Sequence, residues 1–132
     1  MDIFRWPVRV YYEDTDAGGV VFYANYLRFL ERARTEWLRS IGIEQDQLRT
    51  ELGIIFVVVS CNIRYRKPAR FNEQLDVTVQ IGERRRSSLT FEQQVLRNGE
   101  LLCDAEVRAA AVDHQTFKPR PLPAVISRNP DA

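Results

Sequence analysis

Hydrophobic residues recur with two different periods along the chain, and the change of period predicts where helix gives way to sheet. Residues 8–13 alternate, with Val8, Val10 and Tyr12 on one side, which predicts a half-buried first strand. The turn-forming segment EDTDAGG follows. Apolar residues then recur at offsets of three and four, which predicts one long amphipathic helix that ends before Gly42. Its apolar face consists of Phe22, Tyr26, Phe29, Leu30, Ala33, Trp37 and Ile41.

From residue 54 onward the apolar period is two, which is typical of strands. One long strand is predicted over residues 54–66 and another over residues 74–81, with Gly82 beginning the next turn. A further strand contains Leu89, Phe91 and Val95. The dipeptide Asn98-Gly99, which is preferred in two-residue hairpins of type I′, separates it from a last strand over residues 101–111.

The order of these elements is strand, long helix and four antiparallel strands, which predicts an α+β fold with one helix against one face of a five-stranded sheet. The whole chain, residues 1–132, is expected to form one domain, and the proline-rich tail from about residue 114 to residue 132 is expected to be irregular. A single helix covers only part of such a sheet. Because long edge strands are usually paired or shielded, self-association is expected.

Composition and charge exclude several classes of partner. With 19 basic and 18 acidic residues the formal net charge is +1, so nothing suggests a nucleic acid or a membrane surface as partner. No segment reaches the roughly 18 apolar residues of a membrane span and no secretory leader is recognisable, which favours a cytoplasmic protein. Cys61 and Cys103 show no metal-binding or redox spacing and are expected to be buried free thiols.

Groups for proton transfer or nucleophilic attack are few. The single histidine, His114, follows the last predicted strand and is expected at the surface. A clustered histidine and cysteine metal site and a Ser-His-Asp triad are therefore disfavoured. Nucleotide-binding glycine loops and the G-x-S-x-G elbow of α/β-hydrolases do not occur in the sequence.

Acidic residues concentrate between the first strand and the helix, where Asp14 and Asp16 precede Gly18 and Gly19. Backbone amides at a helix N-terminus favour a carboxylate and polarise an incoming carbonyl oxygen, so an acid and an oxyanion site are compatible there. Alternatively, Asp14 or Asp16 only caps the helix. Binding of magnesium by the acidic residues is a weaker alternative, because neighbouring side chains of a strand point in different directions.

The segment VRVYYEDTDAGGVVFYANYLRFLERARTEWL resembles the opening motif of the 4-hydroxybenzoyl-CoA thioesterase family, and in particular its Tol-Pal-associated acyl-CoA thioesterase branch. The similarity continues through FVVVSCNIRYRKPARFNEQLDV and covers roughly residues 6–113. It implies a hotdog fold, in which a curved antiparallel sheet wraps the long helix and two subunits join their sheets side by side. It also implies hydrolysis of an acyl-CoA thioester without cofactor or metal, by a homodimer or homotetramer.

In the resembled family the second acidic residue of the D-x-D motif, here Asp16, acts as nucleophile or as general base toward water, and backbone amides near Gly19 and near residues 55–57 are candidates for holding the oxyanion. The Tol-Pal-associated branch usually has histidine where this chain has Tyr23. A tyrosine donates a hydrogen bond but is a far weaker base at neutral pH. Tyr23 is therefore expected to assist Asp16 rather than replace the histidine.

Three adjacent arginines, Arg84, Arg85 and Arg86, match basic residues that contact coenzyme A phosphates in the aromatic-thioesterase branch. Guanidinium groups pair well with phosphate, so these arginines are expected to bind the nucleotide end of the substrate, and a solvated basic turn is the alternative. Two other functions stay open. One is a non-catalytic hotdog module that binds acyl-CoA or a partner protein, and the other, less favoured, is a dehydratase or hydratase, which typically needs an aspartate and histidine pair.

Overall fold

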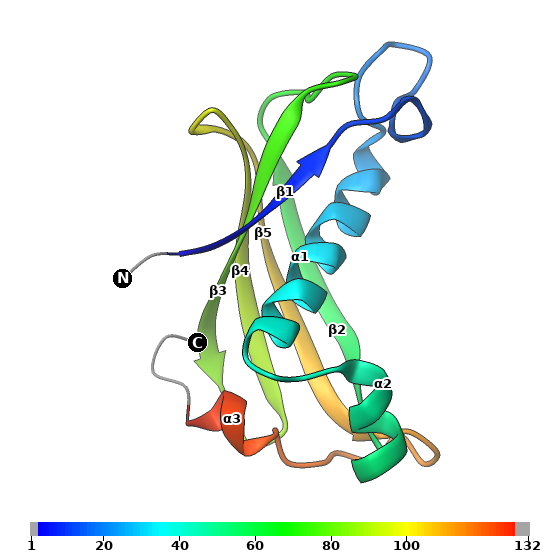
Figure 1. Cartoon of the computed structure of the whole chain (residues 1–132), viewed down its shortest axis with the longest axis vertical. Coiled ribbons are helices and arrows are strands. Elements are labelled where there is room, and N and C mark those ends of the chain that lie inside the picture. The colour runs from blue at the N-terminus through cyan, green and yellow to red at the C-terminus, as the bar shows by residue number, and fades with distance from the viewer. Residues whose placement is uncertain (1–2, 129–132) are drawn as a thin grey trace.

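The computed structural model describes residues 3–128 and consists of one sheet, one long helix and short helical turns (Figure 1). The elements are β1 (Phe4–Arg9), the 3₁₀ turns η1 (Tyr12–Asp14) and η2 (Tyr23–Asn25), α1 (Tyr26–Ser40), α2 (Gln45–Gln47), the π-helical turn η3 (Leu48–Leu52), β2 (Ile54–Tyr65), β3 (Gln74–Arg84), β4 (Ser88–Arg97), β5 (Glu100–Asp113) and α3 (Ala124–Ser127).

The five strands form a single antiparallel sheet in the order β1-β3-β4-β5-β2, and α1 lies across one face of it (Figure 1). The predicted α+β arrangement of one long helix on a five-stranded antiparallel sheet is therefore confirmed. Asn98 and Gly99 both have positive φ, at 50° and 83°, as a type I′ hairpin between β4 and β5 requires.

The core lies between α1 and the facing side of the sheet. Phe29, Leu30 and Ala33 of the helix have no exposed surface, and the ring of Trp37 meets that of Phe91 on β4 edge to face at 5.8 Å. The inward residues of β3 and β5 complete this layer. Burial of each large apolar side chain contributes about 1.5–3 kcal/mol, so the helix is held mainly by this face.

The chain between β1 and α1 differs from the sequence prediction. The first strand was expected over residues 8–13, but β1 begins at Phe4 and the chain leaves the sheet after Arg9. It then turns through η1, which leaves Tyr12 75% exposed. The helix was expected from Phe22, yet Phe22 is extended, with φ −59° and ψ 131°, and α1 begins at Tyr26. Side-chain hydrogen bonds within this segment, described below, override the apolar periodicity at both ends.

Other boundaries and burial predictions also need correction. β3 continues through Arg84, and an irregularity in its pairing with β4 follows Ile81, so Gly82 lies within the strand rather than at the start of a turn. Cys103 is buried as expected, and desolvation raises the pKa of its thiol to about 12. Cys61 is exposed, because it lies on the edge strand β2.

The C-terminal tail is more ordered than expected up to residue 128. α3 forms there, and Leu122 and Ile126 are buried against the sheet end. Residues 129–132 of the predicted irregular tail lie outside the described residues. Among residues 3–128 no helix is long and apolar enough to cross a membrane.

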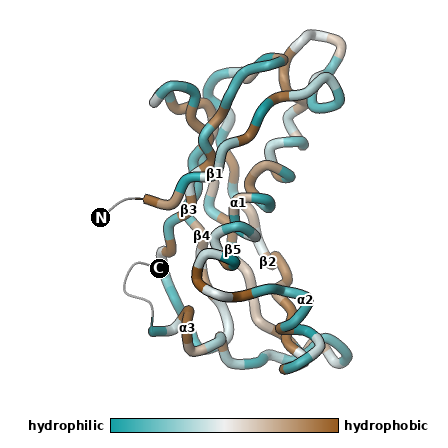
Figure 2. Tube along the Cα trace, in the orientation of Figure 1, coloured by the Kyte–Doolittle hydropathy of each residue, from teal (hydrophilic) through white to brown (hydrophobic). Residues whose placement is uncertain are grey.

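The two edges of the sheet are unequal. β1 has six residues and includes Pro7, whereas β2 has twelve residues and begins with a continuous hydrophobic stretch (Figure 2). Val58 and Val59, in the middle of β2, are 54% and 55% exposed. A long apolar edge strand with unpaired backbone groups is a surface that proteins normally cover.

Candidate functional site

The segment that carries Asp16 is a hairpin-like loop beyond the N-terminal end of α1. Residues 15–21, here called the Asp16 loop, are closed by a bridge between Thr15 and Val21 and tied to the chain before β3 by a bridge between Val20 and Arg70. The amide of Val21 also donates to the carbonyl oxygen of Ala69 at 2.8 Å. The loop is thus fixed at its base while its tip faces solvent.

The side chain of Asp16 is exposed at the tip of this loop. Its Oδ1 accepts a hydrogen bond from the amide of Gly18 at 2.8 Å, and its carbonyl oxygen accepts one from the amide of Gly19 at 3.0 Å. Gly19 has φ +81°, a conformation that side chains rarely adopt. Oδ2 of Asp16 accepts no hydrogen bond from residues 3–128, and because the residue is exposed this oxygen is available as an acceptor or nucleophile.

Asp14, only two residues earlier, has a different environment. Its side chain is 6% exposed, Oδ2 accepts from the amide of Tyr11 at 2.8 Å, and Oδ1 accepts from Nδ2 of Asn25 at 2.7 Å. Neither Asp14 nor Asp16 caps α1, because the N-cap position belongs to Asn25 and has no side-chain cap. The two carboxylates therefore have separate roles, with Asp14 inside the fold and Asp16 at its surface.

Tyr23 lies at the other end of the same segment, in η2. Its ring is 63% exposed, lies edge to face with Tyr65 at 6.1 Å and is tilted against Phe22 at 4.9 Å. The hydroxyl of Tyr65, at the end of β2, donates to the Tyr23 carbonyl oxygen at 2.9 Å. The aromatic contacts hold the Tyr23 ring, and its hydroxyl bonds to no other described residue between 3 and 128.

A hollow of about 510 Å³ lies beside this segment. Its wall includes the ring of Tyr12, which stacks on that of Phe71 with 3.7 Å between centroids, together with Tyr11 and Arg9. Small-molecule sites commonly have volumes of about 300–1,000 Å³ and mostly apolar walls with a few polar groups. The hollow was not predicted, because Phe71 is far from Tyr12 in sequence and follows no apolar period.

The three arginines lie at the opposite end of the sheet from the Asp16 loop within one chain (Figure 1). β3 separates the two regions, and its 11 residues span about 33–36 Å. Arg84 donates to the carbonyl oxygen of Ile126 at 2.8 Å, and Arg85 pairs with Glu83, whose carboxyl pKa it lowers. Arg86 is exposed. One chain therefore does not bring the arginines to Asp16.

His114 also lies at that opposite end. It follows the last residue of β5, is half-buried rather than fully at the surface, and donates its backbone amide to the carbonyl oxygen of Gly53 at 2.9 Å. A triad that includes both His114 and Asp16 of one chain is incompatible with this placement.

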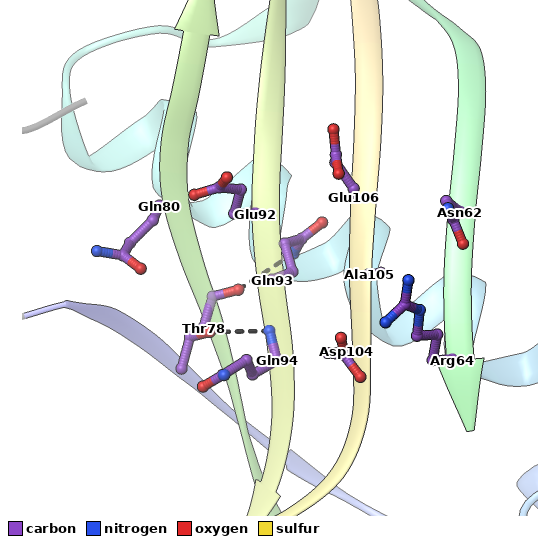
Figure 3. Close-up of a pocket in the computed structure, with 10 residues that line it drawn as sticks. All are labelled: Asn62, Arg64, Thr78, Gln80, Glu92, Gln93, Gln94, Asp104, Ala105 and Glu106. Carbon is purple, nitrogen blue, oxygen red and sulfur yellow. Dashed lines mark hydrogen bonds between the residues drawn. The ribbon is translucent and has the colours of Figure 1, made fainter. Parts of the chain in front are cut away.

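A second concentration of carboxylates occupies the sheet face that points away from α1 (Figure 3). This outer hollow has a volume of about 340 Å³. Glu92 on β4 and Glu106 on β5 are direct cross-strand partners, and neither forms an ion pair within residues 3–128. Residues of β2, β3, β4 and β5 line it, and the polar side chains on this face are those of Asn62, Arg64, Thr78, Gln80, Glu92, Gln94, Asp104 and Glu106 (Figure 3). The side chain of Gln93 instead lies on the α1 side, where its Nε2 donates to the carbonyl oxygen of Leu30 at 3.1 Å.

Comparison with known proteins relates the chain to a family of hydrolases. A family model described as the thioesterase-like superfamily matches residues 10–129. The chain belongs to the thioesterase-like superfamily. It is 47% identical over 125 residues to the acyl-CoA thioester hydrolase YbgC of Escherichia coli O6:H1, covering 94% of this chain and 92% of that protein. It is 45% identical over 120 residues to the acyl-CoA thioesterase YbgC of Haemophilus influenzae, covering 91% and 88%.

The fold comparison agrees with this thioesterase-like membership. The crystal structure of a probable thioesterase from Bartonella henselae superposes with a TM-score of 0.88 at 33% identity, covering 92% of this chain and all of that one. The predicted hotdog fold and the predicted resemblance to acyl-CoA thioesterases are thus confirmed, and the YbgC relatives are consistent with the Tol-Pal-associated branch.

Two residues around the site of this thioesterase-like chain were not predicted. Asn25 lies in the segment predicted as helix and was given no role, and Tyr65 lies on the apolar side of a predicted strand. Both contact the segment between β1 and α1 through hydrogen bonds that span 11 and 42 residues. The sequence contained one local signal for Asn25, which is that asparagine is typical of turns and helix starts. It contained no such signal for Tyr65.

Proposed function

We propose that the protein is an acyl-CoA thioesterase, which hydrolyses an acyl-CoA thioester to a free acid and coenzyme A with Asp16 as the reacting carboxylate. The observation that carries the proposal is the exposed carboxylate of Asp16, held by a glycine amide in a chain that is 47% identical to an acyl-CoA thioester hydrolase. Membership of the thioesterase-like superfamily over residues 10–129 supports it.

Two routes share the same requirements. Either Asp16 attacks the thioester carbon and water then hydrolyses the resulting anhydride, or Asp16 removes a proton from the water that attacks. In both routes the carbon–sulfur bond breaks, coenzyme A leaves as a thiolate that takes up a proton, and water is the only co-substrate. Tyr23 is proposed to donate a hydrogen bond to the carbonyl oxygen or to orient water, and the backbone at Gly19 to contact the thioester.

We also propose that the working unit is at least a homodimer joined along β2, whose exposed apolar edge supports this arrangement. β2 runs from Ile54, beside the end of β5, to Tyr65, beside Tyr23. An isologous antiparallel pair sets the Tyr65 end of one strand beside the Ile54 end of the other. This pairing places the Arg84–Arg86 turn of one copy at the same end of the dimer as Asp16 of the other, where it is proposed to bind the phosphates of coenzyme A.

The cytoplasm is the proposed location, because acyl-CoA thioesters are made and used there. Fractionation of cells that express the protein at its natural level tests this location. Recovery with the periplasmic fraction would contradict it.

Thiol release from short, long and aromatic acyl-CoAs tests the proposed function. The parent is expected to cleave at least one class, and Asp16→Asn is expected to lose about 100-fold or more of kcat, the usual contribution of a positioned base or nucleophile. Glu106→Gln, which also removes one exposed carboxylate, is the matched control and should retain the parent rate. A folded parent that binds acyl-CoA but cleaves none favours the non-catalytic binding module instead.

Val59→Lys tests the dimer, because a charge in the middle of an edge strand opposes pairing. Light scattering is expected to show dimers or larger assemblies for the parent and monomers for the variant, with loss of turnover. Val125→Lys, at another exposed valine on α3, is the control. Parent monomers with full activity would overturn the dimer proposal.

A further inference from the structure

Asn25 occupies the N-cap position of α1 but does not cap the helix. Asparagine is one of the preferred N-cap residues because its side-chain oxygen accepts a hydrogen bond from an amide of the first turn. Here the side chain turns away from its own helix, and Nδ2 donates to Oδ1 of Asp14 at 2.7 Å. The backbone of Asn25 is already helical, with φ −71° and ψ −20°, because η2 leads directly into α1, so its side chain is used for this contact rather than for a cap.

Asp14 is buried although it bears a carboxyl group. A carboxylate that is 6% exposed loses most of its hydration, and no ion pair within residues 3–128 compensates for it. Instead, its two oxygens accept hydrogen bonds from Tyr11 and Asn25, and its carbonyl oxygen accepts one from the amide of Phe22 at 2.9 Å. One residue therefore joins both ends of the segment that contains the Asp16 loop.

The connection lies close in sequence to both of the proposed reacting groups. Asp16 follows Asp14 by two residues, and Tyr23 precedes Asn25 by two residues. The Asp14–Asn25 hydrogen bond is the direct side-chain link between these two short arms. Loss of this bond would leave the two arms joined only through the backbone, by the Thr15–Val21 bridge and by the hydrogen bond from the Phe22 amide to the Asp14 carbonyl oxygen.

We propose that Asp14 and Asn25 are positioning residues, whose buried hydrogen bond sets the Asp16 carboxylate against Tyr23 and the bound thioester. The inference rests on the proposed function and adds to it a role for two residues that do not contact substrate. Misplacement of a reacting group by about 1 Å lowers a rate by about 100-fold, so a bond this close to Asp16 is expected to govern kcat.

Exchange of the aspartate and the asparagine between positions 14 and 25 tests the inference. Asn25→Asp sets two carboxylates 2.7 Å apart and is expected to lower kcat about 10- to 100-fold, with KM changed less than about threefold. In the double variant Asp14→Asn with Asn25→Asp, the amide introduced at position 14 accepts from the Tyr11 amide and donates to the carboxylate introduced at position 25, so every hydrogen bond is reproduced. Most of the lost kcat should return. Asn98→Asp, in the β4–β5 turn, controls for the added charge.

The pH profile separates positioning from loss of structure. Two carboxylates at this distance share a proton, which raises the pKa of one of them. The ratio of kcat in Asn25→Asp to kcat in the parent is therefore expected to rise as pH falls from 8 to 6. A folded Asn25→Asp variant with parent kcat overturns the inference, and so does a folded double variant as slow as the single one. If Asn25→Asp does not fold, the double variant alone decides, whereas a parent inactive on every thioester contradicts the proposed function.

Discussion

Two regions of the molecule bring acidic side chains together, and they differ in what surrounds the oxygens. In the Asp16 loop a backbone amide donates to the exposed carboxylate, while the neighbouring Asp14 is buried and satisfied. In the outer hollow, Glu92 and Glu106 face each other across strands, where backbone amides are paired within the sheet ladder. The two regions thus differ in backbone hydrogen-bond donors, because an amide donates to the Asp16 carboxylate whereas the amides around Glu92 and Glu106 belong to the sheet ladder.

After Asp16→Asn, the largest expected effect comes from Tyr23→Phe, which removes the hydroxyl and retains the ring contacts with Phe22 and Tyr65. kcat is expected to fall about 10- to 100-fold, as for loss of a hydrogen-bond donor in the transition state. Steady-state kinetics on the preferred thioester measures it. Unchanged kcat would remove Tyr23 from the reaction and leave Asp16 alone.

Gly19→Ala tests whether the backbone of the Asp16 loop must keep its conformation. Alanine at φ +81° is strained and is expected to destabilise the fold by about 1–2 kcal/mol, although open space surrounds the added carbon. A rearranged loop should also lower kcat about tenfold. Urea unfolding measures the loss of stability, and steady-state kinetics measures the loss of kcat. Gly99→Ala, also at positive φ but in the β4–β5 turn, should lose stability without losing kcat.

Gly18→Ala is expected to disturb the Asp16 carboxylate less than Gly19→Ala does. An added Cβ would lie 3.2 Å from Oδ1 of Asp16, so the side chain has to shift by a few tenths of an ångström. A decrease in kcat of about two- to fivefold is expected, with little change in stability, because Gly18 is not left-handed. Equal kcat in the parent and the variant would contradict the importance of this amide contact.

Glu106→Gln is expected to have the smallest effect and to act in the opposite direction. Removal of one of two like charges that face each other across strands should stabilise the fold by about 0.2–1 kcal/mol, or about 1–3 °C in Tm, without a change in kcat. Added salt should raise the Tm of the parent more than that of the variant, because screening weakens the same repulsion. A loss of activity would instead assign chemistry to the outer hollow.

The strands and the helix were largely predictable because their signals are local. Periods of two and of three to four residues reflect which side chains face the core, and they located β2 to β5 and α1 within a few residues. The largest errors concern the segment from residue 10 to residue 25. There, the buried hydrogen bonds of Asp14 decide where β1 ends and where the helix begins. These bonds leave no trace in the spacing of apolar residues.

The sequence by itself determined the order of elements, the family and the choice of Asp16 as the candidate carboxylate, because these depend on residue identity and short spacing. Only the tertiary structure decided that Asp14 is buried while Asp16 is exposed, that β2 is a free edge, and that Arg84–Arg86 lie far from Asp16 within one chain. These features depend on strand order and on hydrogen bonds between residues distant in sequence. Local pattern contains no information on such contacts, because it registers only neighbours along the chain.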